Sequence, residues 1–206
     1  MIDLYFWTTD NGDKARQAME ESGLAHRLRP VDLSKKEQFQ PEFLKISPGH
    51  KIPALVDDEG PGGARISLCE SGTILKYLAE KAGGALYPAD PELRLKVEQW
   101  FFYGTSTFTP LAQQYGLFMH RFGEDVPPAK NHYLAQLRDM FGTYDRHLAG
   151  NDCLAGSYSI ADISCYPDIH IHGAQGIGLG ELPNLKRWHD AIEARPAVKK
   201  AWGPYK

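Results

Sequence analysis

The sequence predicts an α+β protein in which an N-terminal α/β domain precedes an all-α helical domain. Short apolar runs with the spacing of strands occur before residue 83, whereas apolar residues at helical spacing dominate after residue 91. The glycines and prolines between these positions interrupt both patterns, which is typical of a linker. We therefore expect an α/β domain at residues 1–82, a linker at 83–91 and a helical domain at 92–206.

The first half of the α/β domain reads as strand, helix, strand. The apolar residues 2–7 predict a strand, and the turn after them leads into a helix that ends near Gly23. A second strand is expected at residues 28–33, and Pro30 assigns it to a sheet edge because proline has no N–H for a ladder bond. The core face of the helix carries Ala15, Ala18 and Met19.

The second half reads as hairpin and helix after an irregular or helical piece at residues 38–46. Residues 53–56 and 65–68 predict two strands joined by a glycine-rich turn at 57–63. Such a stretch can also cradle phosphate, but this one joins two strands and opens no helix, which favours the turn. A helix follows over residues 71–82, with Ile74, Leu75 and Leu78 facing inward. This order of elements is typical of a thioredoxin-like domain.

The helical domain is predicted from apolar residues three and four positions apart. Ser159 and Asp162 have the spacing of a capping box at the start of one of its helices, a structural role. Aromatic residues between positions 100 and 119 either fill the core or line an apolar pocket. The expected core positions are Leu93, Val97, Trp100, Phe101, Leu134, Leu137, Phe141, Tyr144 and Leu148.

The composition indicates in which cellular compartment the protein lies and which classes of binding partner are not expected. The net charge of −3 gives no reason to expect nucleic acid or an anionic membrane as a partner. Asp3 stands where a signal peptide carries positive charge, and no apolar run approaches the ~20 residues that a membrane span needs. Cys69, Cys153 and Cys165 are odd in number and form no Cys-x-x-Cys pair, which favours a reducing compartment over a disulfide framework. We expect a cytoplasmic protein.

The histidines and Cys69 are assigned no chemical role. The eight histidines include His170 and His172, which lie two positions apart and therefore point to different faces of a helix. We expect core or surface histidines and no metal. Strand alternation turns Cys69 away from the ligand edge, so a buried, inert thiol is expected there.

Two short stretches carry the candidate site. After the Pro48-Gly49 turn, Ile52-Pro53 opens a strand, and this bond can be trans or cis, as about 5–6% of Xaa-Pro bonds in folded proteins are. A cis bond would leave the Ile52 backbone open to an extended, peptide-like ligand. Glu70 and Ser71 open a helix and form either an ordinary N-cap pair or an anion site beside a carboxylate. A ligand with an α-carboxylate and an α-amino group would suit that second arrangement.

These motifs resemble a known family over essentially the whole chain. Ser-Pro-Gly-His-Lys-Ile-Pro at 47–53 with Glu-Ser-Gly at 70–72 looks like the glutathione site of the cytosolic glutathione S-transferase superfamily. The opening residues 1–12, with Gln38-Phe39 and Pro41-Glu42-Phe43, further resemble the bacterial Nu class and the Ure2-like proteins. The resemblance implies a homodimer, and we predict that the Ile52-Pro53 bond at the loop-to-strand junction is cis.

The resemblance also implies residue roles. Glu70 and Ser71 would hold the γ-glutamyl end of glutathione, and Gln38 and Lys51 would lie near its glycyl end. Lys130 and His132 are the nearest matches to a basic residue that contacts a second glutathione in the Nu class. The implied glutathione-binding set is Thr9, Asn11, Gln38, Lys51, Ile52, Pro53, Glu70 and Ser71.

The sulfur of glutathione needs a partner at the first helix. A free thiol has a pKa near 8.5, and donors at a helix N-terminus lower it. Related families use Tyr, Ser or Cys near this point, but Tyr5 lies inside the strand and no Cys is present. The resemblance implies Thr9 and Asn11 as catalytic donors, with Thr8 nearby, whereas the simpler interpretation is N-capping by Asn11 or Asp10.

Three functional hypotheses follow. The first is a glutathione-dependent transferase and disulfide-bond oxidoreductase that acts on a small electrophile or disulfide through the thiolate of bound glutathione, with no protein cysteine and no metal. The second is a non-enzymatic glutathione-binding or regulatory protein, although this chain lacks the long polar extension expected of such a regulator. The third is a glutathione-dependent isomerase, dehalogenase or etherase, because the electrophile pocket has no readable code.

Overall fold

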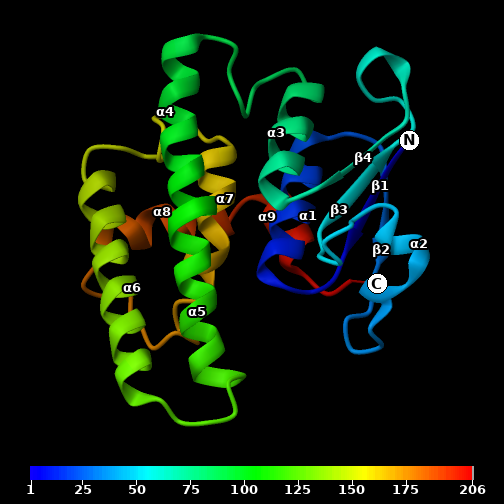
Figure 1. The fold of residues 1–206 in the computed structure, drawn as a ribbon. Coiled ribbons are helices and arrows are strands. Elements are labelled where there is room, and N and C mark those ends of the chain that lie inside the picture. The colour runs from blue at the N-terminus through cyan, green and yellow to red at the C-terminus, as the bar shows by residue number, and fades with distance from the viewer. Residues whose placement is uncertain (206) are drawn as a thin grey trace. The chain divides into compact units, whose positions relative to one another are not determined.

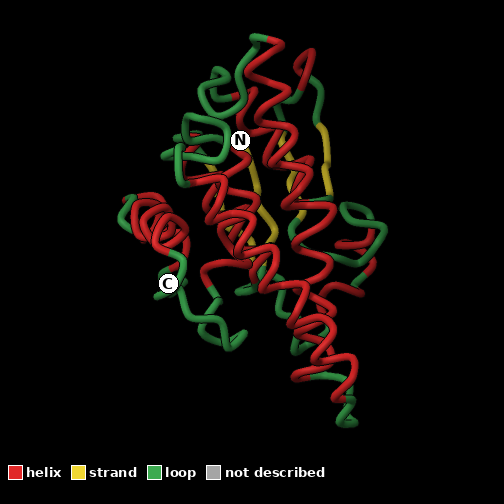
Figure 2. The backbone as a smooth tube through the Cα atoms, turned by 90° about the vertical axis from the view of Figure 1, so that its left-hand side faces the viewer, coloured by secondary structure: helices red, strands yellow, loops and turns green. Residues whose placement is uncertain are grey.

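A four-stranded sheet forms the centre of the first of two units in the computed structural model, which describes residues 1–205 (Figure 1). The strand order is β2-β1-β3-β4, with β1 and β2 parallel and the other neighbours antiparallel. Figure 2 shows the strands side by side in yellow. The strands are β1 (Ile2–Phe6), β2 (His26–Pro30), β3 (Ala54–Asp57) and β4 (Ile66–Cys69). This is the mixed sheet expected of a thioredoxin-like domain.

Helices cover the sheet with the predicted faces. Helix α1 (Asp10–Ser22) ends at Gly23, whose φ of +66° places it in the left-handed region that glycine adopts without cost. Short elements η1 (Glu37–Phe39) and α2 (Pro41–Leu44) fill the region expected to be irregular, and α3 (Ser71–Lys81) follows β4. The six residues predicted to face the core are all buried: Ala15, Ala18, Met19, Ile74, Leu75 and Leu78.

The predicted strand bounds were partly wrong. Strand β2 is an edge strand, as Pro30 indicated, but it begins at His26 and ends at Pro30. The start of β2 was missed because Arg27 and Arg29 interrupt the apolar pattern expected of a strand. Their guanidinium groups pair with Asp3 on β1, at 2.6 and 3.3 Å. Strands β3 and β4 each begin one residue later than expected, and the glycine-rich turn between them contains the short η2 (Pro61–Gly63).

The last helix, α9 (Pro196–Trp202), belongs to the first unit and not to the helical domain predicted over 92–206. The first unit comprises residues 1–87 and the segment from Arg195 onward. Arg195 forms two hydrogen bonds with Glu21 at 2.6 and 2.8 Å, and the Trp202 indole N–H donates to the Gln17 side chain at 2.9 Å. Pairings between residues more than 170 positions apart leave no periodic signal. The break after residue 87 falls inside the expected linker.

The second unit, residues 88–194, consists of helices joined by loops. Three of its elements, α4, η3 and α5, follow one another without interruption, and η3 is a π-helical turn within this rod (Figure 1). The elements are α4 (Pro91–Phe102), η3 (Tyr103–Phe108), α5 (Thr109–His120), α6 (Pro127–Leu148), α7 (Ile160–His170) and α8 (Pro183–Glu193). None of the helices within residues 1–205 has the length and apolar character to cross a membrane.

Most predicted core positions of the second unit are buried. Leu137, Phe141, Tyr144 and Leu148 of α6 have no exposed surface, whereas Leu93 of α4 is 48% exposed. Leu93 was assigned wrongly because α4 carries apolar residues on more than one face, and spacing alone does not say which face is covered.

The predicted capping box at the start of α7 is present. The Ser159 hydroxyl accepts from the Ala161 N–H at 3.2 Å, and the Ser159 N–H donates to the Asp162 carboxylate at 3.0 Å. Asp162 also accepts from the Trp188 indole at 2.8 Å, which ties α7 to α8. Its role is structural, as expected.

Candidate functional site

The candidate site lies at one end of the sheet of the first unit. The register pairs Tyr5 with Ala54, and Ala54 with Cys69. Neighbouring strands lie about 4.8 Å apart, so the segments that follow β1, precede β3 and follow β4 meet at the same end. Helices α1 and α3 both begin there. The segments contain Thr9, Asn11, Lys51, Ile52, Pro53, Glu70 and Ser71.

Thr9 is the N-cap of α1. Its hydroxyl oxygen accepts from the Gly12 N–H at 3.1 Å, so the alternative that Asn11 or Asp10 caps this helix is wrong. Asn11 lies half-buried in the first turn, and its carboxamide is not used for capping. At Gly12, a Cβ atom would lie 2.0 Å from the Trp7 carbonyl oxygen, so only glycine lets α1 begin this close to the end of β1.

The turn before β3 is held by the hydroxyl of buried Ser47. This hydroxyl donates to the Lys51 carbonyl at 2.8 Å and accepts from the Lys51 N–H at 3.3 Å. The Ile52-Pro53 bond that follows is cis, which confirms the prediction. Within residues 1–205, neither the N–H nor the C=O of Ile52 makes a hydrogen bond. The Ile52 backbone is therefore open to a ligand in an extended conformation.

Gln38 lies in η1, beside the same turn. The neighbouring Phe39 ring packs on the ring of His50, with centroids 4.9 Å apart, which brings η1 to the Ser47–Pro53 turn. The Gln38 side-chain oxygen is buried and has no hydrogen-bond partner among the described residues. A buried acceptor without a partner carries a desolvation cost that a ligand donor would remove. Lys51 is exposed at the same turn.

The start of α3 is not capped by a side chain. Glu70 occupies the N-cap position with φ of +70°, and its carboxylate makes no capping hydrogen bond. The alternative of an ordinary N-cap pair is therefore wrong. The positive φ is uncommon for a non-glycine residue and is typical of functional positions. The backbone N–H groups of the first turn, from Ser71 onward, are left to an anion.

The three cysteines form no redox pair at this end of the sheet, although Cys69 ends β4 there. Cys69 is half-buried rather than fully buried, which corrects the expectation, because it is the last residue of the edge strand β4. Cys153 and Cys165 lie in the second unit. Residues 8–12, at the start of α1, contain no cysteine. Tyr5 is also half-buried, with its ring 6.1 Å from that of Phe43, and lies within β1.

Two protein-family models match most of the chain. The model described as the glutathione S-transferase N-terminal domain matches residues 4–86, and the model described as the C-terminal domain matches residues 108–196. The chain belongs to the glutathione S-transferase family. The fold class predicted from the sequence and the resemblance to this superfamily are confirmed.

Several bacterial proteins are similar to this glutathione S-transferase over nearly its whole length. It is 42% identical over 203 residues to the disulfide-bond oxidoreductase YfcG of Escherichia coli (strain K12), over 98% of this chain and 94% of that protein. A glutathione transferase family member from Pseudomonas fluorescens pf-5, solved with two glutathione bound, is 33% identical with a TM-score of 0.90, over 98% and 92% of the two chains. A glutathione transferase from Pseudomonas putida, solved with one glutathione disulfide per subunit, is 34% identical with a TM-score of 0.89, over 98% and 90%.

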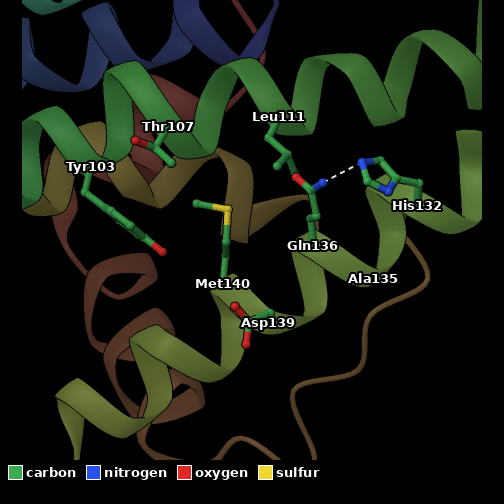
Figure 3. Close-up of a pocket in the computed structure, with 8 residues that line it drawn as sticks. All are labelled: Tyr103, Thr107, Leu111, His132, Ala135, Gln136, Asp139 and Met140. Carbon is green, nitrogen blue, oxygen red and sulfur yellow. Dashed lines mark hydrogen bonds between the residues drawn. The ribbon is translucent and has the colours of Figure 1, made fainter.

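The helical unit of this glutathione S-transferase contains a pocket of about 460 Å³ between the α4–α5 rod and α6 (Figure 3). His132 lies at its edge and is 2.6 Å from the side chain of Gln136. Lys130 instead pairs with Asp125 at 2.6 Å. The pocket is lined by Tyr103, Thr107, Leu111, His132, Ala135, Gln136, Asp139 and Met140.

Sequence reasoning missed the part played by Ser47. It belongs to the motif that carried the resemblance, yet no role was assigned to it, although its hydroxyl fixes the peptide unit next to Ile52. The signal was a serine directly before Pro-Gly, since Ser hydroxyls bond backbone groups in turns.

A separate charged cluster at the other end of β3 is structural. Asp57 is buried and contacts the Lys81 ammonium at 2.7 Å and the Tyr77 hydroxyl at 2.6 Å. Burial acts to raise the pKa of Asp57, but the hydrogen bonds from Lys81, Tyr77 and the Glu59 N–H outweigh it and lower the pKa to about 2.

Proposed function

We propose that the chain is a glutathione-dependent disulfide-bond oxidoreductase with glutathione transferase activity, and that its reactive thiolates belong to glutathione and not to a protein cysteine. One observation carries this proposal: two helix N-termini and the unpaired Ile52 backbone meet at one end of the sheet, where no cysteine lies in the α1 turn. The name of the Escherichia coli relative, 42% identical, supports the reaction type.

The proposed ligand contacts match the chemistry of a γ-glutamyl tripeptide. The α-carboxylate of the γ-glutamyl residue binds the Ser71 hydroxyl and the N–H groups at the start of α3, and its ammonium binds Glu70. The cysteinyl backbone pairs with the Ile52 N–H and C=O, next to Pro53. The glycyl carboxylate lies near Lys51, and a glycyl N–H satisfies the buried Gln38 oxygen.

Thr9 and Asn11 act on the sulfur as donors. The Thr9 oxygen accepts from the Gly12 N–H, and its hydroxyl proton can still be donated to another acceptor. The Trp7 carbonyl is 3.5 Å from this hydroxyl, at the limit of a hydrogen bond, and competes weakly for that proton. Together with the Asn11 amide and the α1 N-terminus, the hydroxyl favours the thiolate over the thiol.

The reaction is two thiol–disulfide exchanges. The bound glutathione thiolate attacks one sulfur of a small disulfide, and the other sulfur leaves as a thiolate and takes a proton. A second glutathione thiolate then attacks the glutathione sulfur of the mixed disulfide and releases the second substrate thiol. The products are glutathione disulfide and two thiols, so two glutathione molecules supply the two electrons. With an electrophile, the same thiolate forms a thioether.

The second glutathione needs its own contacts. The relative from Pseudomonas fluorescens was solved with two glutathione molecules bound. Of our two candidates, His132 borders a pocket, whereas the Lys130 ammonium is already paired with Asp125. We therefore place His132 ahead of Lys130.

We further propose a cytoplasmic homodimer. Exposed apolar side chains support an interface: Leu95 is 67% exposed, Phe102 on the same helix is 50% exposed and Phe39 is 51% exposed. A stable twofold interface buries more than about 1,000 Å². The three free cysteines suit a reducing compartment.

The test of the mechanism is a variant without cysteine, C69S/C153S/C165A, assayed with glutathione and 2-hydroxyethyl disulfide. We expect turnover within about threefold of the unmodified protein, because the sulfur belongs to glutathione. A folded cysteine-free protein that binds glutathione but has lost its turnover would assign the chemistry to a protein thiol. Retained binding without turnover in the unmodified protein would instead favour a non-enzymatic binding protein.

A further inference from the structure

Three side chains of the second unit bring possible metal ligands together, far from the glutathione chemistry in sequence. His170, His189 and Glu193 each offer one nitrogen or oxygen atom, and these atoms all lie within 4.8 Å of one another. His170 is the last residue of α7, and Glu193 is the last residue of α8. His189 and Glu193 are four positions apart and so share one face of α8.

The spacing of His170 and His172 alone predicts no metal site, because residues two positions apart point to different faces of a helix. The ligand partner of His170 is not its neighbour in sequence but comes from the next helix, 19 positions on. The rings of His170 and His189 stack with centroids 5.9 Å apart and planes 17° apart. The arrangement therefore arises from the packing of α8 on the end of α7.

The strongest observation concerns the burial and hydrogen bonding of His189. Its ring is 7% exposed, and its Nδ1 lies 3.2 Å from the Asp190 carboxylate. A carboxylate accepts, so Nδ1 carries the proton and Nε2 carries a lone pair. This Nε2 atom is buried and has no hydrogen-bond partner within residues 1–205. A histidine that donates Nδ1–H to a carboxylate while its Nε2 faces a ligand position is the arrangement found around protein-bound zinc.

The electrostatic setting also favours a cation. Two helix C-termini meet at the cluster, and each carries a partial negative charge from its unpaired carbonyl groups. Glu193 adds a full negative charge and is exposed, so its flexible side chain can close on an ion. Zinc–ligand bonds of 2.0–2.2 Å require ligand atoms about 3.3 Å apart. Rotation of the Glu193 side chain and a small shift of the rings supply this closure.

We infer that His170, His189 and Glu193 form a binding site for a divalent transition-metal ion of the zinc class, with Asp190 as the positioning residue of His189. Two imidazoles and a carboxylate leave one position for water, and these ligand types suit Zn²⁺ better than Mg²⁺ or Ca²⁺. The bound ion links the end of α7 to the end of α8. It is independent of the glutathione reaction proposed above and is assigned no part in it.

The test is calorimetric titration of Zn²⁺ alone into chelator-treated, tag-free protein at neutral pH, without glutathione, whose thiol also binds zinc. We expect one ion per chain and a rise in melting temperature. Loss of an outer partner alone lowers metal affinity roughly 10–100-fold. His170→Gln, His189→Gln and Glu193→Gln should therefore each weaken binding at least about tenfold, and Asp190→Asn by 10–100-fold.

His120→Gln is the matched control, because His120 is an exposed histidine of α5. The His120→Gln variant should bind Zn²⁺ with the same affinity as the unmodified protein. Glu193 is also exposed, so the Glu193→Gln result does not depend on whether the buried His189 tolerates substitution. A Co²⁺-loaded sample should show tetrahedral ligand-field bands without thiolate-to-cobalt charge transfer. Absence of saturable one-ion binding, unchanged affinity in Glu193→Gln and His170→Gln, or a thiolate band would each overturn the inference.

Discussion

Thr9 has two proposed roles, and the loss of each should affect a different measurement. Its hydroxyl caps α1 through the Gly12 N–H, and the same hydroxyl is our proposed donor to the glutathione sulfur. Thr9→Val keeps the shape but removes both roles, whereas Thr9→Ser keeps both. Loss of an N-cap costs about 1 kcal/mol, whereas loss of one preorganised donor costs about 10²–10³ in turnover, or 2.7–4 kcal/mol.

These magnitudes decide which effect is seen. A domain stable by 5–15 kcal/mol remains more than about 99% folded after losing 1 kcal/mol, so unfolding cannot explain even a twofold loss of activity. The cap effect appears instead as a fall of about 2–4 °C in melting temperature. Loss of the donated hydrogen bond should raise the pKa of the bound glutathione thiol toward 8.5, because the thiolate loses a stabilising partner. Each pKa unit corresponds to about 1.4 kcal/mol.

The assay measures kcat and KM with glutathione and 2-hydroxyethyl disulfide across pH, with thiolate absorbance as the second readout. We expect Thr9→Ser to stay within about threefold of the unmodified protein and Thr9→Val to lose roughly 10²-fold in kcat with little change in glutathione affinity. If Thr9→Val loses only thermal stability and its thiol pKa is unchanged, Thr9 is a helix cap and nothing more.

Three further predictions concern other parts of the chain. Glu70→Gln should weaken glutathione binding by roughly 1–3 kcal/mol in calorimetry, and unchanged affinity would contradict its contact with the γ-glutamyl ammonium. The folded-state pKa of Asp57 is about 2, below its usual 3.8, so the ionised carboxylate stabilises the fold. This stabilisation is complete above pH 3.8 and is lost as the pH falls toward 2. Asp57→Asn should cost about 2 kcal/mol in urea unfolding at pH 7 and roughly half as much at pH 3; an equal cost at both would refute this origin. Trp202→Phe removes the indole donor to Gln17 and should cost about 1–2 kcal/mol, and a variant as stable as the parent would show that this bond does not hold α9.

The sequence predicted those features that depend on neighbouring residues. Pro30 marked the edge strand, Gly23 marked the end of α1, and Ser159 with Asp162 marked the start of α7. The cis bond before Pro53 was predicted at the junction of a loop and a strand. These signals are local, because each arises from the backbone preference or hydrogen bonding of one or a few residues.

Features that depend on distant residues or on atomic detail were missed. Periodicity placed α9 with the helices before it, although Arg195 and Trp202 dock on α1. Capping propensity does not separate Thr9 from Asn11, since both residue types cap helices and only backbone geometry selects one. The neighbours of His170 could not be found from spacing, because His189 reaches it across a helix-to-helix contact.

The docking of α9 has a consequence for synthesis of the chain. The unit that contains the proposed glutathione site is built from two separate segments, and the 107 residues of the helical unit lie between them in the sequence. At roughly 5–20 residues per second, a ribosome needs about 5–20 s to make that insert. Throughout this interval the nascent first unit lacks Arg195 and Trp202, and its α1 surface is uncovered. The first unit is therefore completed only after α9 (Pro196–Trp202) has been synthesised, and a chain terminated before Arg195 lacks the helix that covers α1.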